Sequence, residues 1–203
     1  MIDFTTFCDY TGTFAFAISG IRLASAKQFD WLGAYVIGVV TAVGGGTIRD
    51  VFLNATPFWM LQPSYLIISA LALVFVLIFR KYLISLHNTF FIFDAIGLGL
   101  FGMLGIAKAL DFGFPMWVAI VMGTITGAFG GMTRDILINE VPLIFRKDIY
   151  ALACVVGGFV YYACMLLDVN LTLTQFLAAA SIFLTRIISV KYHISVPVLK
   201  GEE

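Results

Sequence analysis

The sequence predicts an all-α integral membrane protein with seven transmembrane helices, and three observations lead to that prediction. Of its 203 residues, 61% are hydrophobic and only 12% are charged, and the mean hydropathy is +1.02. Soluble domains are nearer half apolar and a quarter charged. Seven apolar runs of membrane-spanning length account for the chain, and two of its segments repeat one motif. We therefore expect a single transmembrane domain over residues 1–203, without a separate soluble domain.

The seven apolar runs follow one another along the chain, separated by short polar segments. Lipid cannot hydrogen-bond to the backbone, so each run is expected to form a helix. The runs are too long and too continuously apolar for the strands of a barrel. No basic region precedes the first run, so it is expected to stay in the membrane rather than to be cleaved as a signal peptide. The predicted helices cover residues 4–25, 31–53, 63–80, 89–108, 115–138, 149–167 and 173–190.

Positive charge is concentrated at alternate ends of the predicted helices. Basic residues follow the first, third, fifth and seventh helices, whereas Lys108 is nearly alone at the opposite ends. Cytoplasmic loops carry the excess of Lys and Arg in membrane proteins. This pattern predicts a multi-pass protein of the cell inner (plasma) membrane, with the N-terminus outside and the C-terminus in the cytoplasm. The basic residues that set this orientation are Arg22, Lys27, Arg80, Lys81, Arg146, Lys147, Lys191 and Lys200.

The chain repeats itself with an offset of 85 residues and no gap. Eighteen positions between 9 and 65 have an identical partner 85 residues later, which makes a strong internal repeat. Each copy, about 4–85 and about 89–170, contains three predicted helices, so the second copy enters the membrane from the opposite side. The helix at about 173–190 lies outside the repeat. Transporters and some channels share this inverted arrangement, with the working site near the midplane between the copies.

The repeated motif reads "GGGTIRD" at 44–50 and "GGMTRD" at 130–135. Two interpretations of the glycines compete. Small residues let membrane helices approach closely, or consecutive glycines kink or break the helix and expose carbonyl groups to a cation. Glycine runs that occur twice beside an Arg-Asp pair favour the broken helix. The residues predicted to line a pore or contact an ion are Gly44, Gly45, Gly46, Thr47, Asp50, Gly130, Gly131, Thr133 and Asp135.

The Arg-Asp pairs of both motifs fall within predicted membrane spans. An intramembrane charge costs about 2.5–3.5 kcal/mol at the bilayer centre and normally faces the interior of a bundle or water. Adjacent residues of a helix point in different directions, so the Arg and Asp of one motif are not expected to neutralise each other. Matched depths predict pairs between Asp9 and Arg49 and between Asp94 and Arg134, which would leave the aspartates of the motifs free to face the pathway. The alternative is that these charges only hold the bundle together.

Lys108 also has two interpretations. It lies near the outer end of the fourth predicted helix, where it either snorkels to the membrane interface or provides a mobile charge in the outer pathway and contributes to gating. Elsewhere the sequence lacks a nucleophile elbow, an HExxH motif, a Walker loop and a dinucleotide fingerprint. We therefore expect neither an enzyme nor a metal site.

The doubled motif, with its Asn and Pro residues at 54, 57, 139 and 142, resembles the prokaryotic members of the TRIC family, the trimeric intracellular cation channels. The resemblance covers residues 4 to about 190. It implies a homotrimer with a pore in each protomer that passes potassium and sodium, and second and fifth helices that bend at the glycine motifs. In one respect the second motif departs from the pattern, because Phe129 stands where the first copy has Gly44. The same bacterial family is also described as a glycine-transporter domain.

The leading functional prediction is therefore a monovalent cation channel, with a pore in each protomer lined by glycine-kinked helices. The alternative is a secondary transporter of glycine or another small amino acid, in which arginine holds the carboxylate and aspartate holds the ammonium group. A purely structural membrane scaffold would leave the intramembrane charges unexplained. The expected ligands are transported potassium or sodium ions and a bound lipid. The expected partners are membrane lipid and further copies of the chain, and nucleic acid is not expected.

Overall fold

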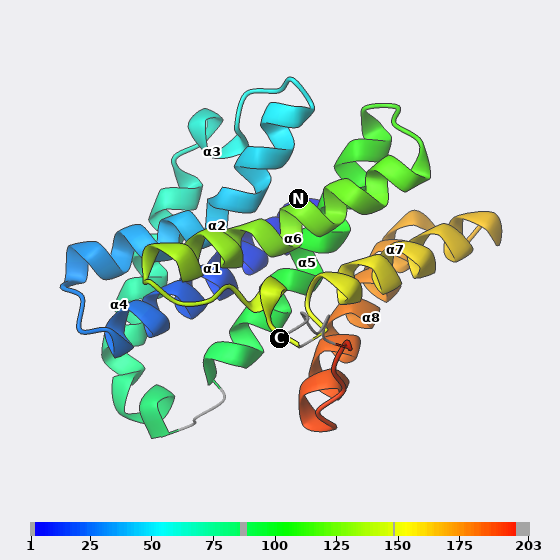
Figure 1. Cartoon of the computed structure of the whole chain (residues 1–203). Coiled ribbons are helices and arrows are strands. Elements are labelled where there is room, and N and C mark those ends of the chain that lie inside the picture. The colour runs from blue at the N-terminus through cyan, green and yellow to red at the C-terminus, as the bar shows by residue number, and fades with distance from the viewer. Residues whose placement is uncertain (1–2, 86–88, 148, 198–203) are drawn as a thin grey trace, which may run out of the picture.

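A computed structural model describes residues 3–85, 89–147 and 149–197, and within these ranges the chain forms eight α-helices and one 3-10 turn (Figure 1). A long helix occupies each of the seven predicted runs. The two short elements, α3 and η1, were not predicted, and each follows one copy of the repeated motif. The elements are α1 (Phe4–Ala26), α2 (Trp31–Phe52), α3 (Phe58–Leu61), α4 (Ser64–Ser85), α5 (Thr89–Asp111), α6 (Met116–Leu137), η1 (Leu143–Phe145), α7 (Ala151–Leu166) and α8 (Leu171–Lys191).

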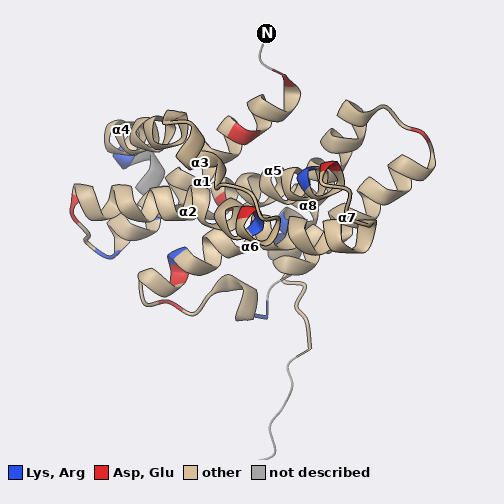
Figure 2. Cartoon of the chain, turned by 90° about the horizontal axis from the view of Figure 1, so that it is seen from above, with Lys and Arg blue, Asp and Glu red and all other residues tan. Residues whose placement is uncertain are grey.

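The surface of the helix bundle is strongly apolar. Four helices are long and apolar enough to cross a membrane, at Trp31–Phe52, Phe90–Asp111, Met116–Leu137 and Leu171–Lys191, and two shorter apolar helices cover Ser64–Arg80 and Ala151–Leu166. Large apolar side chains are exposed along most helices; Trp31 and Trp117, for example, are more than 70% exposed. Charged residues are a minority along the ribbon (Figure 2). A water-soluble monomer rarely exposes so much contiguous apolar surface, so this surface suits contact with lipid or with other chains.

Four helices form the centre of the bundle, and they pair positions that are 85 residues apart. Helix α1 packs against α5 and α2 packs against α6, while α4 flanks one side and α7 with α8 flank the other (Figure 1). The rings of Phe16 and Phe101, which are equivalent positions, meet between α1 and α5 with centroids 5.4 Å apart. Gly12 lies against Phe101 and Gly97 lies against Phe16. Each copy of the repeat therefore makes the same glycine–phenylalanine contact with the other copy.

The prediction that the glycine motifs break their helices is wrong, because α2 and α6 run without interruption through both motifs. Gly45 and Gly130 instead lie where these two helices cross. A β-carbon at Gly45 would overlap the carbonyl oxygen of Thr126, and one at Gly130 would overlap the carbonyl oxygen of Thr41. Only glycine lets the two backbones approach this closely, which is the small-residue packing that membrane helices use. The backbone hydrogen bonds of both helices remain intact, as expected where no water replaces them.

The basic loops lie together at one end of the bundle. Lys27, after α1, forms an ion pair of 2.7 Å with Glu140, after α6, and its hydrogen bond lowers the pKa of the Glu140 carboxyl. The chain beyond α8 is joined to the same end, because Val196 donates a backbone hydrogen bond to Lys147. Lys200 and the side chain of Lys81, which contribute to the predicted orientation, lie outside the described residues.

Candidate functional site

The first copy of the motif builds a cluster made of Asp9, Arg49, Asp50, Tyr65 and Lys108. We call it the outer cluster, after the side on which the predicted orientation would place it. Asp50 is its centre and is fully buried. Its Oδ1 atom accepts from Arg49, at 2.8 Å from Nε and 2.7 Å from Nη2, and from Lys108 Nζ at 2.9 Å. Its Oδ2 atom accepts from the backbone N–H of Phe58 at 3.0 Å. One carboxylate thus joins the end of α2, the end of α5 and the start of α3.

Asp9 lies in the same cluster but does not make the predicted pair. The hydroxyl of Tyr65, from α4, donates to Asp9 Oδ2 at 2.6 Å, while Arg49 turns to Asp50. The expected Asp9–Arg49 ion pair is therefore wrong. The pair is absent because the hydroxyl of Tyr65, at the same depth, donates to the Asp9 carboxylate. The Arg49 guanidinium binds the adjacent Asp50 instead.

The second copy builds the inner cluster, made of Ser19, Asp94, Arg134, Asp135 and Tyr150. Arg134 Nε binds Asp135 Oδ1 at 2.9 Å. Its Nη1 atom binds Asp94 directly and also donates to Ser19 Oγ at 2.7 Å. Asp135 Oδ2 accepts from the backbone N–H of Leu143 at 3.0 Å, as Asp50 does in the outer cluster. The expected contact between Asp94 and Arg134 is therefore present, whereas its role in gating remains a prediction.

The two aspartates of the motifs are bound rather than free, which corrects two expectations. In both copies the long arginine side chain folds back at the end of the helix onto the adjacent aspartate, so neighbours in sequence do neutralise each other. The second oxygen of each aspartate holds the loop that follows, through a backbone N–H. A carboxylate with charge-assisted bonds on both oxygens is fixed in place. Asp50 and Asp135 thus anchor the helix ends, instead of pointing freely into a pathway.

Lys108 and the two threonines of the motifs also have defined partners. The 30% exposed side chain of Lys108 reaches inward to Asp50 and does not snorkel away from the bundle. Thr47 and Thr133 donate to carbonyl groups one turn earlier in their own helices, at 2.7 and 2.8 Å, and Thr47 also accepts from the indole of Trp59 at 3.0 Å. Their hydroxyl protons are therefore committed to the protein. A role for the glycines and threonines in contacting an ion remains a prediction.

Four residues in or beside the clusters were not singled out from the sequence: Ser19, Tyr65, Tyr150 and Arg186. Tyr65 and Tyr150 are among the identical pairs of the repeat, which was the one available signal. Arg186, in α8, is only 1% exposed and lies between the rings of Phe91 and Tyr150, with its Nη1 donating to the Ile149 carbonyl at 3.0 Å. An arginine inside an apolar run of membrane-spanning length is itself a signal of a functional or structural interior position.

The fold and the two clusters define an all-helical membrane protein with buried charges in its interior. The family described as "Glycine transporter" matches residues 6–81 and again residues 91–165. The UPF0126 inner membrane protein YadS of Escherichia coli (strain K12) is 36% identical over 198 residues, covering 96% of both chains. A UPF0126 membrane protein of Vibrio cholerae is 38% identical over 192 residues, covering 93% of this chain and 80% of that one.

Solved structures agree with these sequence matches. The TRIC trimeric intracellular cation channel orthologue from Rhodobacter sphaeroides superposes with a TM-score of 0.88 at 35% identity, covering 94% of this chain and 98% of that one. A prokaryotic TRIC channel, solved in 0.5 M KCl, also gives 0.88, at 33% identity and with 97% and 100% covered. This chain belongs to the prokaryotic TRIC family, the same family that carries the description "Glycine transporter". Its relatives are channel and membrane proteins and not enzymes.

Proposed function

We propose that this protein is a channel for monovalent cations, potassium and sodium, with one pore in each protomer of a homotrimer. The observation that carries the proposal is the pair of buried Arg-Asp clusters beside the α2–α6 crossing, in a chain whose solved relatives at 33–35% identity are described as cation channels. Each cluster contains two carboxylates, which favour cations. Arg49 is bound to Asp50, and Arg134 to both Asp94 and Asp135, so the arginines hold the site together rather than repel the ion.

The topology proposed for the channel is two inverted three-helix units plus α8, which makes seven spans. Its supports are the family match to residues 6–81 and 91–165, together with paired contacts at positions 85 residues apart. An odd number of spans in each unit inverts the second one. The N-terminus is proposed to lie outside and the C-terminus in the cytoplasm, since the loops carrying Lys27 and Lys147 lie at the same end of the bundle as the chain beyond α8.

Current through planar bilayers tests the proposed function. Purified protein under asymmetric KCl is expected to give discrete current steps that reverse towards the potassium equilibrium potential. Asp50→Asn is expected to lower the current severalfold, because it removes the carboxylate that holds Arg49, Lys108 and the backbone of Phe58 together. Asp111→Asn, which changes an exposed carboxylate at the end of α5, is the matched control and should conduct normally. Absence of current together with saturable glycine uptake into liposomes of the same preparation would replace the channel by the carrier.

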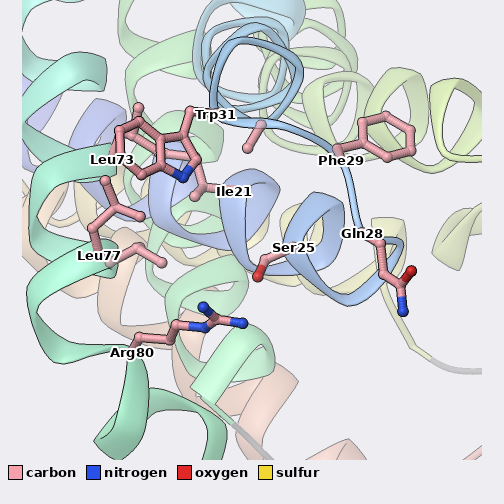
Figure 3. Close-up of a pocket in the computed structure, with 10 residues that line it drawn as sticks. Ile21, Ser25, Gln28, Phe29, Trp31, Leu73, Leu77 and Arg80 are labelled. Carbon is pink, nitrogen blue, oxygen red and sulfur yellow. The ribbon is translucent and has the colours of Figure 1, made fainter.

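The expected lipid ligand has a candidate site away from the charged clusters. A cavity of about 310 Å³ lies between the end of α1, the start of α2 and α4. Figure 3 shows Ser25, Gln28 and Arg80 on one side of this cavity, with Trp31 and Leu73 on the other. A polar rim with one cation beside an apolar wall suits a lipid with an anionic headgroup. In the second copy of the repeat, Leu110, Gly113 and Met165 replace the three polar residues, so the fold itself does not require them.

Arg80→Gln tests this lipid site. Protein extracted from vesicles that contain phosphatidylglycerol is expected to retain that lipid in a native mass spectrum. The variant is expected to lose most of it, because the substitution removes the one cation among the described residues that line the cavity. Arg146→Gln removes an exposed arginine from the same end of the bundle and should retain the lipid. Equal retention by both variants would show that the cavity is not the binding site.

A further inference from the structure

The same three positions are paired differently in the two clusters. In the outer cluster the tyrosine holds the aspartate, because Tyr65 donates to Asp9 at 2.6 Å. In the inner cluster the arginine holds the equivalent aspartate, because Arg134 binds Asp94. The hydroxyl of Tyr150, which is equivalent to Tyr65, has no hydrogen-bond partner in the described part of the chain. Two copies of one Asp-Arg-Tyr set thus show two alternative pairings.

The cluster with the tyrosine–aspartate bond is more exposed to solvent than the cluster with the arginine–aspartate pair. In the outer cluster, where the tyrosine holds the aspartate, the side chain of Lys108 is 30% exposed and Asp9 is partly exposed. In the inner cluster, where the arginine holds the aspartate, the side chains of Asp94 and Arg134 are both 0% exposed. The arginine–aspartate pair joins α6 to α5 by an ion pair, whereas the tyrosine–aspartate bond leaves α2 and α1 without the equivalent ion pair among the described residues.

A difference in sequence explains why the two halves differ. In the outer half the ring of Phe58 lies over Gly46 and packs edge-on against Tyr65, with centroids 4.4 Å apart. The inner half has Leu143 at the position of Phe58. There the tyrosine hydroxyl occupies the corresponding space, since a β-carbon at Gly131 would lie 2.6 Å from the Tyr150 oxygen. The larger side chain in the outer half therefore excludes the tyrosine from the glycine and directs it to the aspartate.

We propose that Tyr150 is a gating residue of the inner end, and that opening this end transfers Asp94 from Arg134 to the hydroxyl of Tyr150. This inference rests on the proposed function and assigns to it a residue that takes part in opening. The outer cluster provides the geometry of the open arrangement, in Tyr65 and Asp9. Transfer would break the ion pair between α5 and α6, and would leave Asp135 as the one carboxylate bound to Arg134, as Asp50 is the one bound to Arg49.

The buried atoms of the inner cluster are consistent with such a transfer. Among the described residues, three buried atoms of the cluster lack a hydrogen-bond partner: Tyr150 Oη, Asp94 Oδ2 and Arg134 Nη2. The tyrosine hydroxyl, the Arg134 guanidinium and the Asp94 carboxylate all line the space above Gly131, at 2.6, 3.4 and 3.6 Å from the position of a β-carbon there. A buried polar group without a partner is costly. A tyrosine–aspartate bond would satisfy two of these atoms at once, which brings the two arrangements closer in free energy.

Tyr150→Phe tests the assignment, because it removes only the hydroxyl. That hydroxyl has no partner among the described residues in the arginine–aspartate arrangement, so the melting temperature of the variant should match that of the wild type. Its single-channel open probability should fall by about tenfold, the factor expected for losing one hydrogen bond to a charged group. Tyr65→Phe removes a bond that is already formed, so it should lower the melting temperature as well as the current. Tyr162→Phe, on an exposed side chain of α7, is the control and should change neither.

The outcomes separate this inference from the proposed function. An unchanged open probability in Tyr150→Phe, beside normal wild-type currents, overturns the gating role and leaves the channel intact. A fall in open probability matched by a fall in melting temperature also overturns it, since that indicates a structural role. Absence of current in the wild type refutes the channel instead. Phe58→Leu gives a second test: Tyr65 should then move over Gly46 and release Asp9 to Arg49, so the open probability should again fall.

Discussion

Replacing Gly45 by alanine is expected to be among the most damaging single substitutions in this protein. The added β-carbon would overlap the carbonyl oxygen of Thr126, which belongs to the backbone of α6 and cannot rotate away. The two helices would have to separate, at a cost of about 3 kcal/mol or more in the free energy of unfolding. For a chain of this length that corresponds to a fall of roughly 10 °C in the melting temperature. Thermal unfolding in detergent measures it.

The neighbouring glycine provides the matched control. A β-carbon at Gly44 would meet only the Cα atom of Gly130, at an ordinary distance of 3.6 Å. Gly44→Ala should therefore unfold within a few degrees of the wild type, although it changes the same motif on the same helix. Equal damage from both variants would contradict the crossing and would favour a role for the glycines in helix flexibility.

Arg134→Met is expected to destabilise the protein even more. The guanidinium is fully buried and binds two carboxylates, those of Asp94 and Asp135. Its removal leaves two buried negative charges without their cation, and breaking a buried pair in this way costs about 3–5 kcal/mol. The expected result is low yield of folded protein and a melting temperature reduced by 10 °C or more, by the conversion of roughly 2–4 °C per kcal/mol.

Two further variants make that prediction specific to the buried charge. Arg146→Met breaks an ion pair with Glu140 in which both side chains are more than 40% exposed, and such surface pairs contribute about 1 kcal/mol or less. It should unfold almost normally. Adding Asp94→Asn and Asp135→Asn to Arg134→Met removes the uncompensated charges and should recover part of the lost stability. If the triple variant is less stable than the single one, charge balance is not the cause.

The positions of the long helices could be predicted from the sequence because lipid imposes a simple rule. Each span must be continuously apolar and of sufficient length, and the seven runs satisfy this rule visibly. The burial of the motif arginines was equally predictable, since a charge inside an apolar run must face the interior of the bundle or water. The short elements α3 and η1 were not, because four and three residues are too few to show a period.

The pairing of the charges in the outer cluster could not be predicted, because it depends on side-chain directions rather than on depth. Asp9 and Arg49 were matched by their distances from the helix ends. The hydroxyl of a third residue, Tyr65, donates a hydrogen bond to Asp9 instead. The effect of the glycines was misjudged for a related reason. A glycine run weakens an isolated helix, yet here the neighbouring helix supplies the contact that makes glycine necessary. Such effects depend on which surfaces meet, and one sequence does not specify that directly.

The crossing of α2 and α6 has a mechanical consequence. Most helix pairs are held by side chains that interlock as ridges in grooves, which fixes the angle between their axes. At this crossing the backbones of Gly45 and Gly130 face the carbonyl groups of Thr126 and Thr41, with no room for a side chain between them. Such a contact lacks the interlocking side chains that would fix the angle at this point. A change in the angle at this contact would move both charged clusters, because each lies four or five residues from it along its helix.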